Sequence, residues 1–138
     1  MNNGQPSSIS NLIEYLKKNK FTIISCINTD NFGDQQTIFS NESILLSISR
    51  DRLRWIIEIG HTSDKSNMFD VPLLMNYVKY SLADVVSLDD QCTFLINKWD
   101  IIRDLFSADK YASTINALHA LAEKRIKKLL GPNAWENK

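Results

Sequence analysis

The side chains best suited to acid–base or metal chemistry are few in this sequence. His61 and His119 are its only histidines. Metal sites need histidine, cysteine or carboxylate side chains clustered at a characteristic spacing, and no such pattern surrounds either residue. We interpret His119, which lies between apolar residues of a helical segment, as a partly exposed helix position. His61 follows Gly60 at a predicted strand end near Asp64, so a small enzymatic site there stays as an alternative.

The two cysteines, Cys26 and Cys92, are isolated from each other and from the histidines. Neither belongs to a CxxC pair, and nothing in their spacing requires a disulfide. Free cysteines in a reducing compartment behave as small apolar residues. We therefore expect both side chains to lie in the core.

Motifs that bind phosphates or activate nucleophiles are missing from the sequence. It has no GxSxG elbow, no Walker loop and no GxGxxG turn. Only four glycines are present, which leaves little material for a phosphate-binding loop. We therefore expect a protein that is not an enzyme and that holds neither a metal nor a cofactor.

Charged residues are balanced over the whole chain but segregated along it. Acidic and basic residues number 16 each, so the basic excess that is typical of nucleic-acid-binding proteins is missing. Residues 124–128 are rich in cations, which we interpret as the favoured charge at a helix carboxyl end rather than as a phosphate-binding patch. Asp100 and Asp104 fall on one helix face, where a solvated acidic surface is favoured over a catalytic carboxylate pair. The acidic residues of the middle segment are Asp84, Asp89, Asp90, Asp100, Asp104 and Asp109.

The elements that must position these residues are predicted from the spacing of apolar side chains. Segment 8–20 has helical spacing, with Ser8 or Ser10 as the expected N-cap. Segment 61–69 is polar and is predicted to be a loop. Segments rich in β-branched and aromatic residues predict four strands, over residues 21–27, 36–40, 43–49 and 53–60.

A hairpin is the clearest local prediction, because residues 43–60 alternate apolar and polar side chains on both sides of a charged corner. A period of two predicts an antiparallel pair with one face on the core and the other mostly in water. We expect Leu53 and Trp55 on the core face. We interpret Arg50 and Arg52 at the corner mainly as a solvated turn, with contact to a partner as the alternative.

Three helices are predicted after the strands, over residues 70–82, 87–106 and 109–130. Asp70 is expected to cap the first of them, with Pro72 in its first turn. Ser87 or Asp89 is expected to cap the second. The third has an apolar stripe along its whole length and ends at a glycine–proline pair.

Strands that are segregated from helices are typical of the α+β class. We expect one domain over residues 1–138, with an N-terminal helix, an antiparallel four-stranded meander, and three C-terminal helices packed on one face. Residues 1–7 and 132–138 are expected to be flexible tails, the second of which contains Trp135. No apolar run is long enough to span a membrane and the first residues lack a secretion signal, so we expect a cytoplasmic protein.

Residues 8–80 resemble a bacterial family of small cytoplasmic proteins with a helix, a meander and a later helical segment. The residues that carry this resemblance are Leu46, Ile48, Arg50, Asp51, Arg52, Trp55, Ile57 and Ile59. Such chains are similar to the immunity proteins of polymorphic toxin and contact-dependent growth inhibition systems. The resemblance implies a protein that binds a cognate toxin domain, such as a nuclease, and blocks its active site without catalysis of its own.

The charge pattern indicates which surfaces to expect at a toxin interface. Acidic middle helices would complement a basic toxin, and the corner residues Arg50 and Arg52 are free for partner contact. The expected acidic contacts are Asp84, Asp89, Asp90, Asp100 and Asp104. A non-catalytic adaptor or chaperone-like binding module, which includes a homodimer, is the alternative. Neither hypothesis involves nucleic acid or a membrane.

Overall fold

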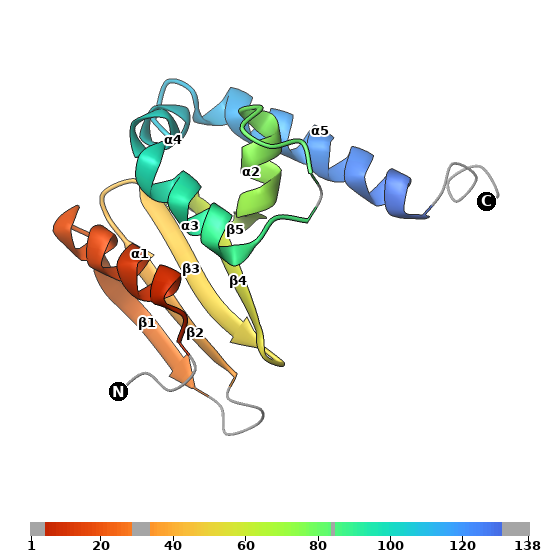
Figure 1. Ribbon diagram of the computed structural model, residues 1–138. Coiled ribbons are helices and arrows are strands. Elements are labelled where there is room, and N and C mark those ends of the chain that lie inside the picture. Colours follow the sequence, from red (N-terminus) through yellow and green to blue (C-terminus); the bar gives the residue numbers. More distant parts are fainter. Residues whose placement is uncertain (1–4, 29–33, 84, 131–138) are drawn as a thin grey trace.

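One helix precedes an antiparallel sheet, and further helices follow it (Figure 1). The computed structural model describes residues 5–28, 34–83 and 85–130. The elements in it are α1 (Ser7–Lys18), β1 (Thr22–Asn28), β2 (Gln35–Ser40), β3 (Ile44–Asp51), β4 (Arg54–His61), β5 (Asp64–Asp70), α2 (Val71–Tyr77), α3 (Leu88–Asn97), α4 (Trp99–Leu105) and α5 (Tyr111–Leu130). The predicted α+β class is confirmed. Asp84, Trp135 and the predicted tail 132–138 lie outside the described residues.

The sheet is a meander in which the strands follow one another in the order β1-β2-β3-β4-β5. Every pair of neighbours is antiparallel, and β3 pairs with β4 from Ile44 opposite His61 to Asp51 opposite Arg54. β5 pairs only with the second half of β4. The alternation that predicted a hairpin over residues 43–60 is therefore confirmed by the register.

The core lies between one face of the sheet and the helices α1, α2 and α3 (Figure 1). Helix α1 buries Ile9, Leu12 and Leu16, whose three-to-four spacing places them on one side of the helix. Each fully buried leucine or isoleucine contributes about 1.5–3 kcal/mol relative to an exposed one. The inward-facing side chains of the sheet include Phe39, Leu46, Ile48, Ile57, Ile59 and Phe69.

Two predicted helix starts are confirmed and one is wrong. The Asp70 carboxylate accepts a hydrogen bond from the Leu73 amide at the start of α2, and the Ser87 hydroxyl accepts one from the Asp90 amide at the start of α3. By contrast, α1 begins after Pro6, with no side-chain cap. The proline ring fixes φ near the −61° observed here, which favours a helix start earlier than the expected serines.

The predicted numbers of strands and helices after α1 are both too low. Segment 61–69, predicted to be a loop, contains most of a fifth strand, β5. Its polar side chains show no alternation, so the sequence alone gives no strand signal. The predicted helix over 87–106 is two helices, because Lys98 between α3 and α4 has φ −111° and ψ 22°, outside helical geometry. Among the described residues, four helices therefore follow the sheet.

Burial also differs from the prediction in both the sheet and the last helix. Cys92 is buried, as predicted, but Cys26 is exposed because β1 is an edge strand. Leu45 and Ser47 lie on the face that was predicted to be mostly wet, yet only 4% and 3% of their surfaces are exposed. The apolar stripe of α5 leaves the core at Ile126, which is exposed together with the two leucines that end the helix.

Candidate functional site

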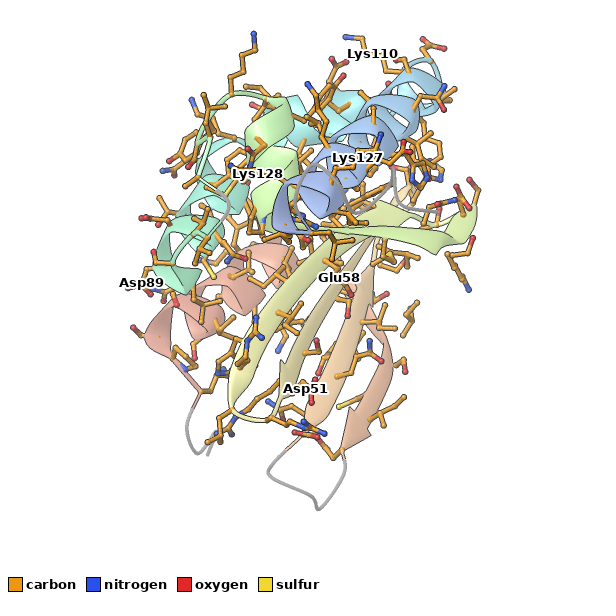
Figure 2. All side chains as sticks on the ribbon, turned by 90° about the vertical axis from the view of Figure 1, so that its right-hand side faces the viewer. Asp51, Glu58, Asp89, Lys110, Lys127 and Lys128 are labelled. Atoms are coloured by element: carbon orange, nitrogen blue, oxygen red, sulfur yellow. The ribbon has the colours of Figure 1, made fainter. Side chains whose placement is uncertain are left out.

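The residues predicted to contact a partner lie on two separate parts of the molecule. Asp89 belongs to the first turn of α3, whereas Arg50 and Arg52 lie at the tip of the β3–β4 hairpin. Figure 2 shows Asp51, which stands between these arginines in the sequence, at the end of the sheet opposite to Lys110. The predicted set is therefore not a single surface patch.

The acidic residues of α4 are neutralised by nearby cations. The Asp100 carboxylate forms an ion pair with Arg103 at 3.0 Å, one helical turn away. Asp104 forms one with Lys110, and this hydrogen bond raises the pKa of the lysine. Exposed pairs of this kind contribute about 0–1 kcal/mol to stability, but they cancel much of the local negative field. α4 is therefore a weaker attractor for a basic partner than its sequence indicates.

Asp89 and Asp90 have a local role at the start of α3. Both lie in the first turn, where the helix dipole favours negative charge. The Asp90 amide also donates to the Ser87 hydroxyl at 3.1 Å. This placement explains the two carboxylates as helix-terminal residues, and both stay accessible to solvent.

The tip of the β3–β4 hairpin has an unusual backbone. Arg52 and Leu53 form its two-residue turn, with φ of 50° and 70°. Both values lie in the left-handed region that favours glycine or asparagine and that a type I′ hairpin turn requires. The Asp34 carboxylate accepts a hydrogen bond from the Arg52 amide at 2.8 Å, which helps to hold the turn.

The prediction that Leu53 lies on the core face is wrong. Its side chain is 69% exposed at the tip, and the ladder begins again only at Arg54. The predicted alternation of core-facing and solvent-facing residues included Leu53, because the sequence does not show that the pairing of β3 with β4 ends at Asp51 and Arg54. At this exposure and at positive φ, the Leu53 side chain contributes nothing to the core.

Arg50 and Trp55 form a cross-strand pair just behind the tip. The guanidinium carbon of Arg50 lies 5.9 Å from the centre of a Trp55 ring, within cation–π range. The Nε of Arg50 is buried without a hydrogen-bond partner among the described residues. Arg50 is therefore more than the solvated turn residue that the sequence favoured, since its head is packed on an aromatic ring.

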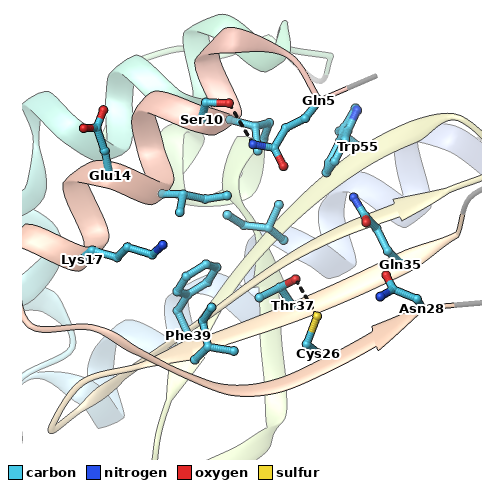
Figure 3. A pocket seen from close by; sticks show the side chains of 14 residues that line it. Gln5, Ser10, Glu14, Lys17, Cys26, Asn28, Gln35, Thr37, Phe39 and Trp55 are labelled. Carbon is cyan, nitrogen blue, oxygen red and sulfur yellow. Dashed lines mark hydrogen bonds between the residues drawn. The ribbon is translucent and has the colours of Figure 1, made fainter. Parts of the chain in front are cut away.

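Trp55 also ends a groove of about 530 Å³ between α1 and the first three strands (Figure 3). Its floor is apolar, with Phe39 and Ile48 from the sheet. Its rim is polar, and there the Gln5 amide donates to the Ser10 hydroxyl at 2.8 Å. The groove and the hairpin tip are thus continuous through Trp55.

Both histidines belong to one polar cluster between the β4–β5 hairpin and α5. The His61 ring stacks beside the Tyr111 ring, with centroids 4.7 Å apart. His119 Nε2 lies 2.9 Å from the Asn67 amide oxygen. The two elements that meet here, β5 and the start of α5, are far apart in the sequence, so no local pattern predicts this cluster.

The Asp64 carboxylate accepts hydrogen bonds from Tyr111 and Asn67, not from His61. The Tyr111 hydroxyl donates to its carboxylate at 2.9 Å, and the Asn67 amide donates at 2.8 Å. These bonds, with the Asn67 bond the larger cause, lower the pKa of Asp64, whereas burial raises that of Tyr111. The cluster is explained as a link between α5 and the sheet, and no group of three or more potential metal ligands exists among the described residues.

Comparisons with known proteins supply no further assignment. No protein-family model, no curated protein and no solved structure matches this chain. In the part of the chain that the structure describes, no helix has the length and apolar character that crossing a bilayer requires. The functional interpretation therefore rests on the geometry described above.

Proposed function

We propose that this chain binds and neutralises a cognate bacterial toxin domain by blocking its active site, and that it has no catalytic activity of its own. The observation that carries the proposal is the tip of the β3–β4 hairpin, where Leu53 is exposed at positive φ. The tip lies at the end of the sheet away from α2, α4 and α5 (Figure 1). It can therefore enter a concave site on another protein without moving the core.

The backbone strain at the tip supports a role in binding. A residue with a side chain at positive φ costs about 1–2 kcal/mol, and the hairpin has two such residues in succession. The turn requires these angles, but glycine or asparagine would adopt them at lower cost, so folding does not explain a leucine here. Here neither side chain is buried in exchange.

The charge of the tip indicates the kind of active site that it fits. Three arginines lie around the exposed leucine in the sequence, Arg50, Arg52 and Arg54. The tip also holds two acidic residues, Asp51 and the Asp34 that binds the Arg52 amide, so its formal charge is positive. Arginine matches carboxylate geometry with paired hydrogen bonds. A catalytic centre built from carboxylates, as in metal-dependent nucleases, is therefore the best complement.

The acidic helices stay a predicted second contact. Asp89 and Asp90 are exposed, but Asp100 and Asp104 are already paired within the chain. We expect substitutions of Asp100 and Asp104 to change toxin binding less than substitutions at the tip. Each of these carboxylates already pairs with a cation of this chain, which competes with any cation of a partner.

The test is a growth assay. The C-terminal region of the open reading frame directly upstream of this gene is expressed with and without this chain. We expect that region to stop growth and this chain to restore it. If the region is harmless, or if it stops growth in the presence of this chain, the toxin hypothesis is wrong.

Leu53→Gly tests the role of the tip within the same assay. Glycine adopts positive φ readily, so the variant should fold with equal or higher stability, by up to about 1 kcal/mol. We expect rescue to be lost, because the apolar contact is gone. Leu82→Gly is the matched control, since Leu82 is 73% exposed in a loop after α2. Full rescue by Leu53→Gly would exclude the tip as the contact.

An adaptor or chaperone-like binding module is the second candidate. The observation that favours it is the exposed apolar surface of the edge strand β1, where Ile23, Ile24 and Ile27 are each about half exposed. A dimer in solution together with a harmless upstream region would move this candidate ahead.

A further inference from the structure

The second face of the sheet, opposite to the helix-covered core, is a shallow apolar hollow. The register places Ile38, Ser47 and Glu58 side by side across three strands. Together with Leu45 and Met68, they line a hollow of about 380 Å³. Leu45 and Ser47 form its buried floor, which explains why these two residues are not exposed.

No helix of the described residues lies over this hollow. The core side chains of α1, α2 and α3 all pack on the opposite face. Figure 2 shows α1 and α3 on one side of the strands and only side chains on the other. Ile24 and Ile27 of β1 extend the apolar surface to the sheet edge, and each is 52% exposed.

One acidic and one basic residue at the hollow have no partner. Neither Glu58 nor Lys65 makes a hydrogen bond or an ion pair with any described residue, and both line the hollow. Asp70, directly opposite Glu58 on β5, is occupied by two hydrogen bonds from Arg125. A half-buried carboxylate beside apolar groups is unfavourable unless a cation reaches it.

We propose that this face is the interface of a homodimer, in which two copies pack face to face about a two-fold axis. Glu58 of each copy pairs with Lys65 of the other. An isologous contact requires a patch that complements itself, and one unpaired charge of each sign in an apolar surround meets that requirement. A different partner protein would have to supply both charges in the matching places.

The face is large enough for such a contact. Five strands spaced about 4.8 Å apart and about seven residues long make a face of roughly 24 by 23 Å. Because side chains corrugate it, its accessible area exceeds the roughly 550 Å² of that rectangle and approaches the about 800 Å² per partner of standard interfaces.

The proposal is tested by sedimentation equilibrium of the full chain over a range of concentrations. We expect a monomer–dimer equilibrium for the natural sequence. Glu58→Lys puts two cations at each contact and should weaken the dimer at least about tenfold, and Lys65→Glu should do the same. The double variant with both substitutions restores opposite charges, so its dimer should recover.

The control and the contrary outcomes are equally specific. Asp104→Lys makes the same charge change on α4, away from this face, and should leave the dimer unchanged. Far-ultraviolet circular dichroism establishes that each variant is folded, and Glu58→Gln provides a milder second variant. A monomer at every concentration up to about 0.5 mM would overturn the proposal.

A dimer that survives both single charge reversals would also overturn it, as would a double variant that does not recover. None of these results depends on whether the upstream open reading frame encodes a toxin, so this inference and the proposed function fail separately.

Discussion

Gly60 is the residue whose identity the fold constrains most directly. A Cβ at this position would lie 2.8 Å from the backbone oxygen of Asn67 and even closer to the sulfur of Met68. Crowding of a packed site typically costs about 1–3 kcal/mol. We therefore expect Gly60→Ala to lower the free energy of unfolding by about that amount, as measured by urea denaturation.

The double variant Gly60→Ala, Met68→Ala separates the two contacts. Removing the sulfur relieves only the flexible contact, whereas the Asn67 oxygen belongs to the backbone and cannot rotate away. Relative to Met68→Ala alone, the added alanine at position 60 should still be destabilising. If it is neutral in that background, the side chain of Met68 is the whole constraint.

Glu58 gives the sheet a predicted pH dependence. Burial, and secondarily the charge of Asp70, raises the pKa of Glu58. The folded state thus binds the proton of the Glu58 carboxyl more tightly than the unfolded state does. The free energy of unfolding therefore falls as the pH rises from the ordinary glutamate pKa through the raised pKa of Glu58. Glu58→Gln removes the charge. We expect a higher Tm than the natural sequence at neutral pH, with the difference vanishing below the ordinary glutamate value of 4.5.

This measurement needs a protein concentration at which the chain is monomeric, because a pairing cation would cancel the effect. Thermal unfolding followed by circular dichroism across the acidic to neutral range is sufficient. Glu42→Gln, which makes the same chemical change in the exposed turn between β2 and β3, is the control for the substitution itself. A constant difference at every pH would mean that the carboxylate charge of Glu58 is not responsible.

Residues with local roles were predictable from the sequence, and residues with distant partners were not. Asp70 and Ser87 act within their own first turns, so the order of residues alone identifies them as caps. Asp104, by contrast, looked like a free surface carboxylate because Lys110 reaches it across the turn between two helices. Cys26 looked like a core residue because the sequence does not show which strand is the sheet edge.

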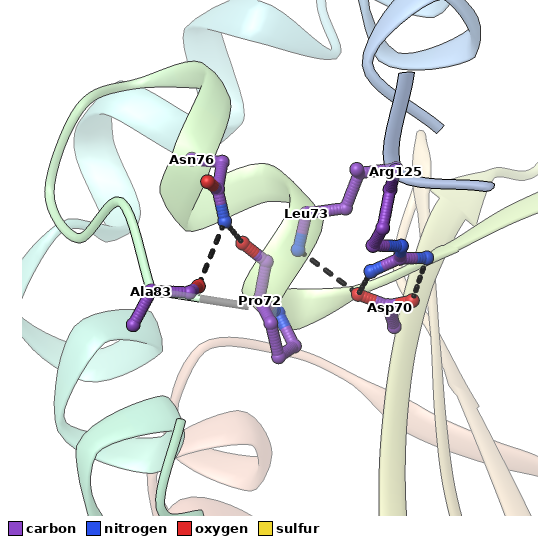
Figure 4. Close-up of polar contacts among 6 residues, drawn as sticks. All are labelled: Asp70, Pro72, Leu73, Asn76, Ala83 and Arg125. Atoms are coloured by element: carbon purple, nitrogen blue, oxygen red, sulfur yellow. Dashed lines mark hydrogen bonds and ion pairs between the residues drawn. The ribbon is translucent and has the colours of Figure 1, made fainter. Parts of the chain in front are cut away.

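Among the elements, α5 is joined to the start of α2 by an ion pair between Arg125 and Asp70. Arg125 donates to both oxygens of Asp70, at 3.0 and 2.7 Å, while the same carboxylate caps α2 through the Leu73 amide (Figure 4). Both charged side chains are about 30% exposed. One carboxylate thus holds the amino end of one helix and the side of another.

We expect Arg125→Ala to lower the free energy of unfolding by about 1.5–3 kcal/mol, because hydrogen bonds to a charged, partly buried group are lost. Arg125→Lys should recover only part of this, since an ammonium cannot make the paired contact. Arg103→Ala, which removes an exposed pair within one helix, is the matched control and should cost less than about 0.5 kcal/mol. Equal losses from the two alanine variants in urea denaturation would contradict this account.

Elements with a regular apolar period were predictable, and the one without it was missed. β3 and β4 alternate strictly, and the five-strand sheet is built outward from that hairpin. β5 has no alternation and is held from outside, by Tyr111 on Asp64 and by His119 on Asn67. A strand whose polar side chains are held in place by a helix more than forty residues later in the sequence has no local signature.

At the scale of the whole molecule, the hairpin tip and the open sheet face are separate surfaces. We therefore predict that substitutions on one surface leave the function of the other unchanged. Leu53 projects from the end of the sheet, whereas Glu58 lies on its face, on the half of β4 that pairs with β5. Substitutions at sites this far apart without shared partners act independently. Leu53→Gly should therefore lose growth rescue and keep the dimer, while Glu58→Lys should lose the dimer and keep rescue.

The double variant should show both losses and no additional defect in folding. Sedimentation equilibrium and the growth assay, run on the same four proteins, give this result directly. If Glu58→Lys alone also abolished rescue while the protein stayed folded, the dimer would be the form that binds the partner. The two tips of one dimer would then have to act together, and a tip variant mixed with the natural chain would interfere with rescue.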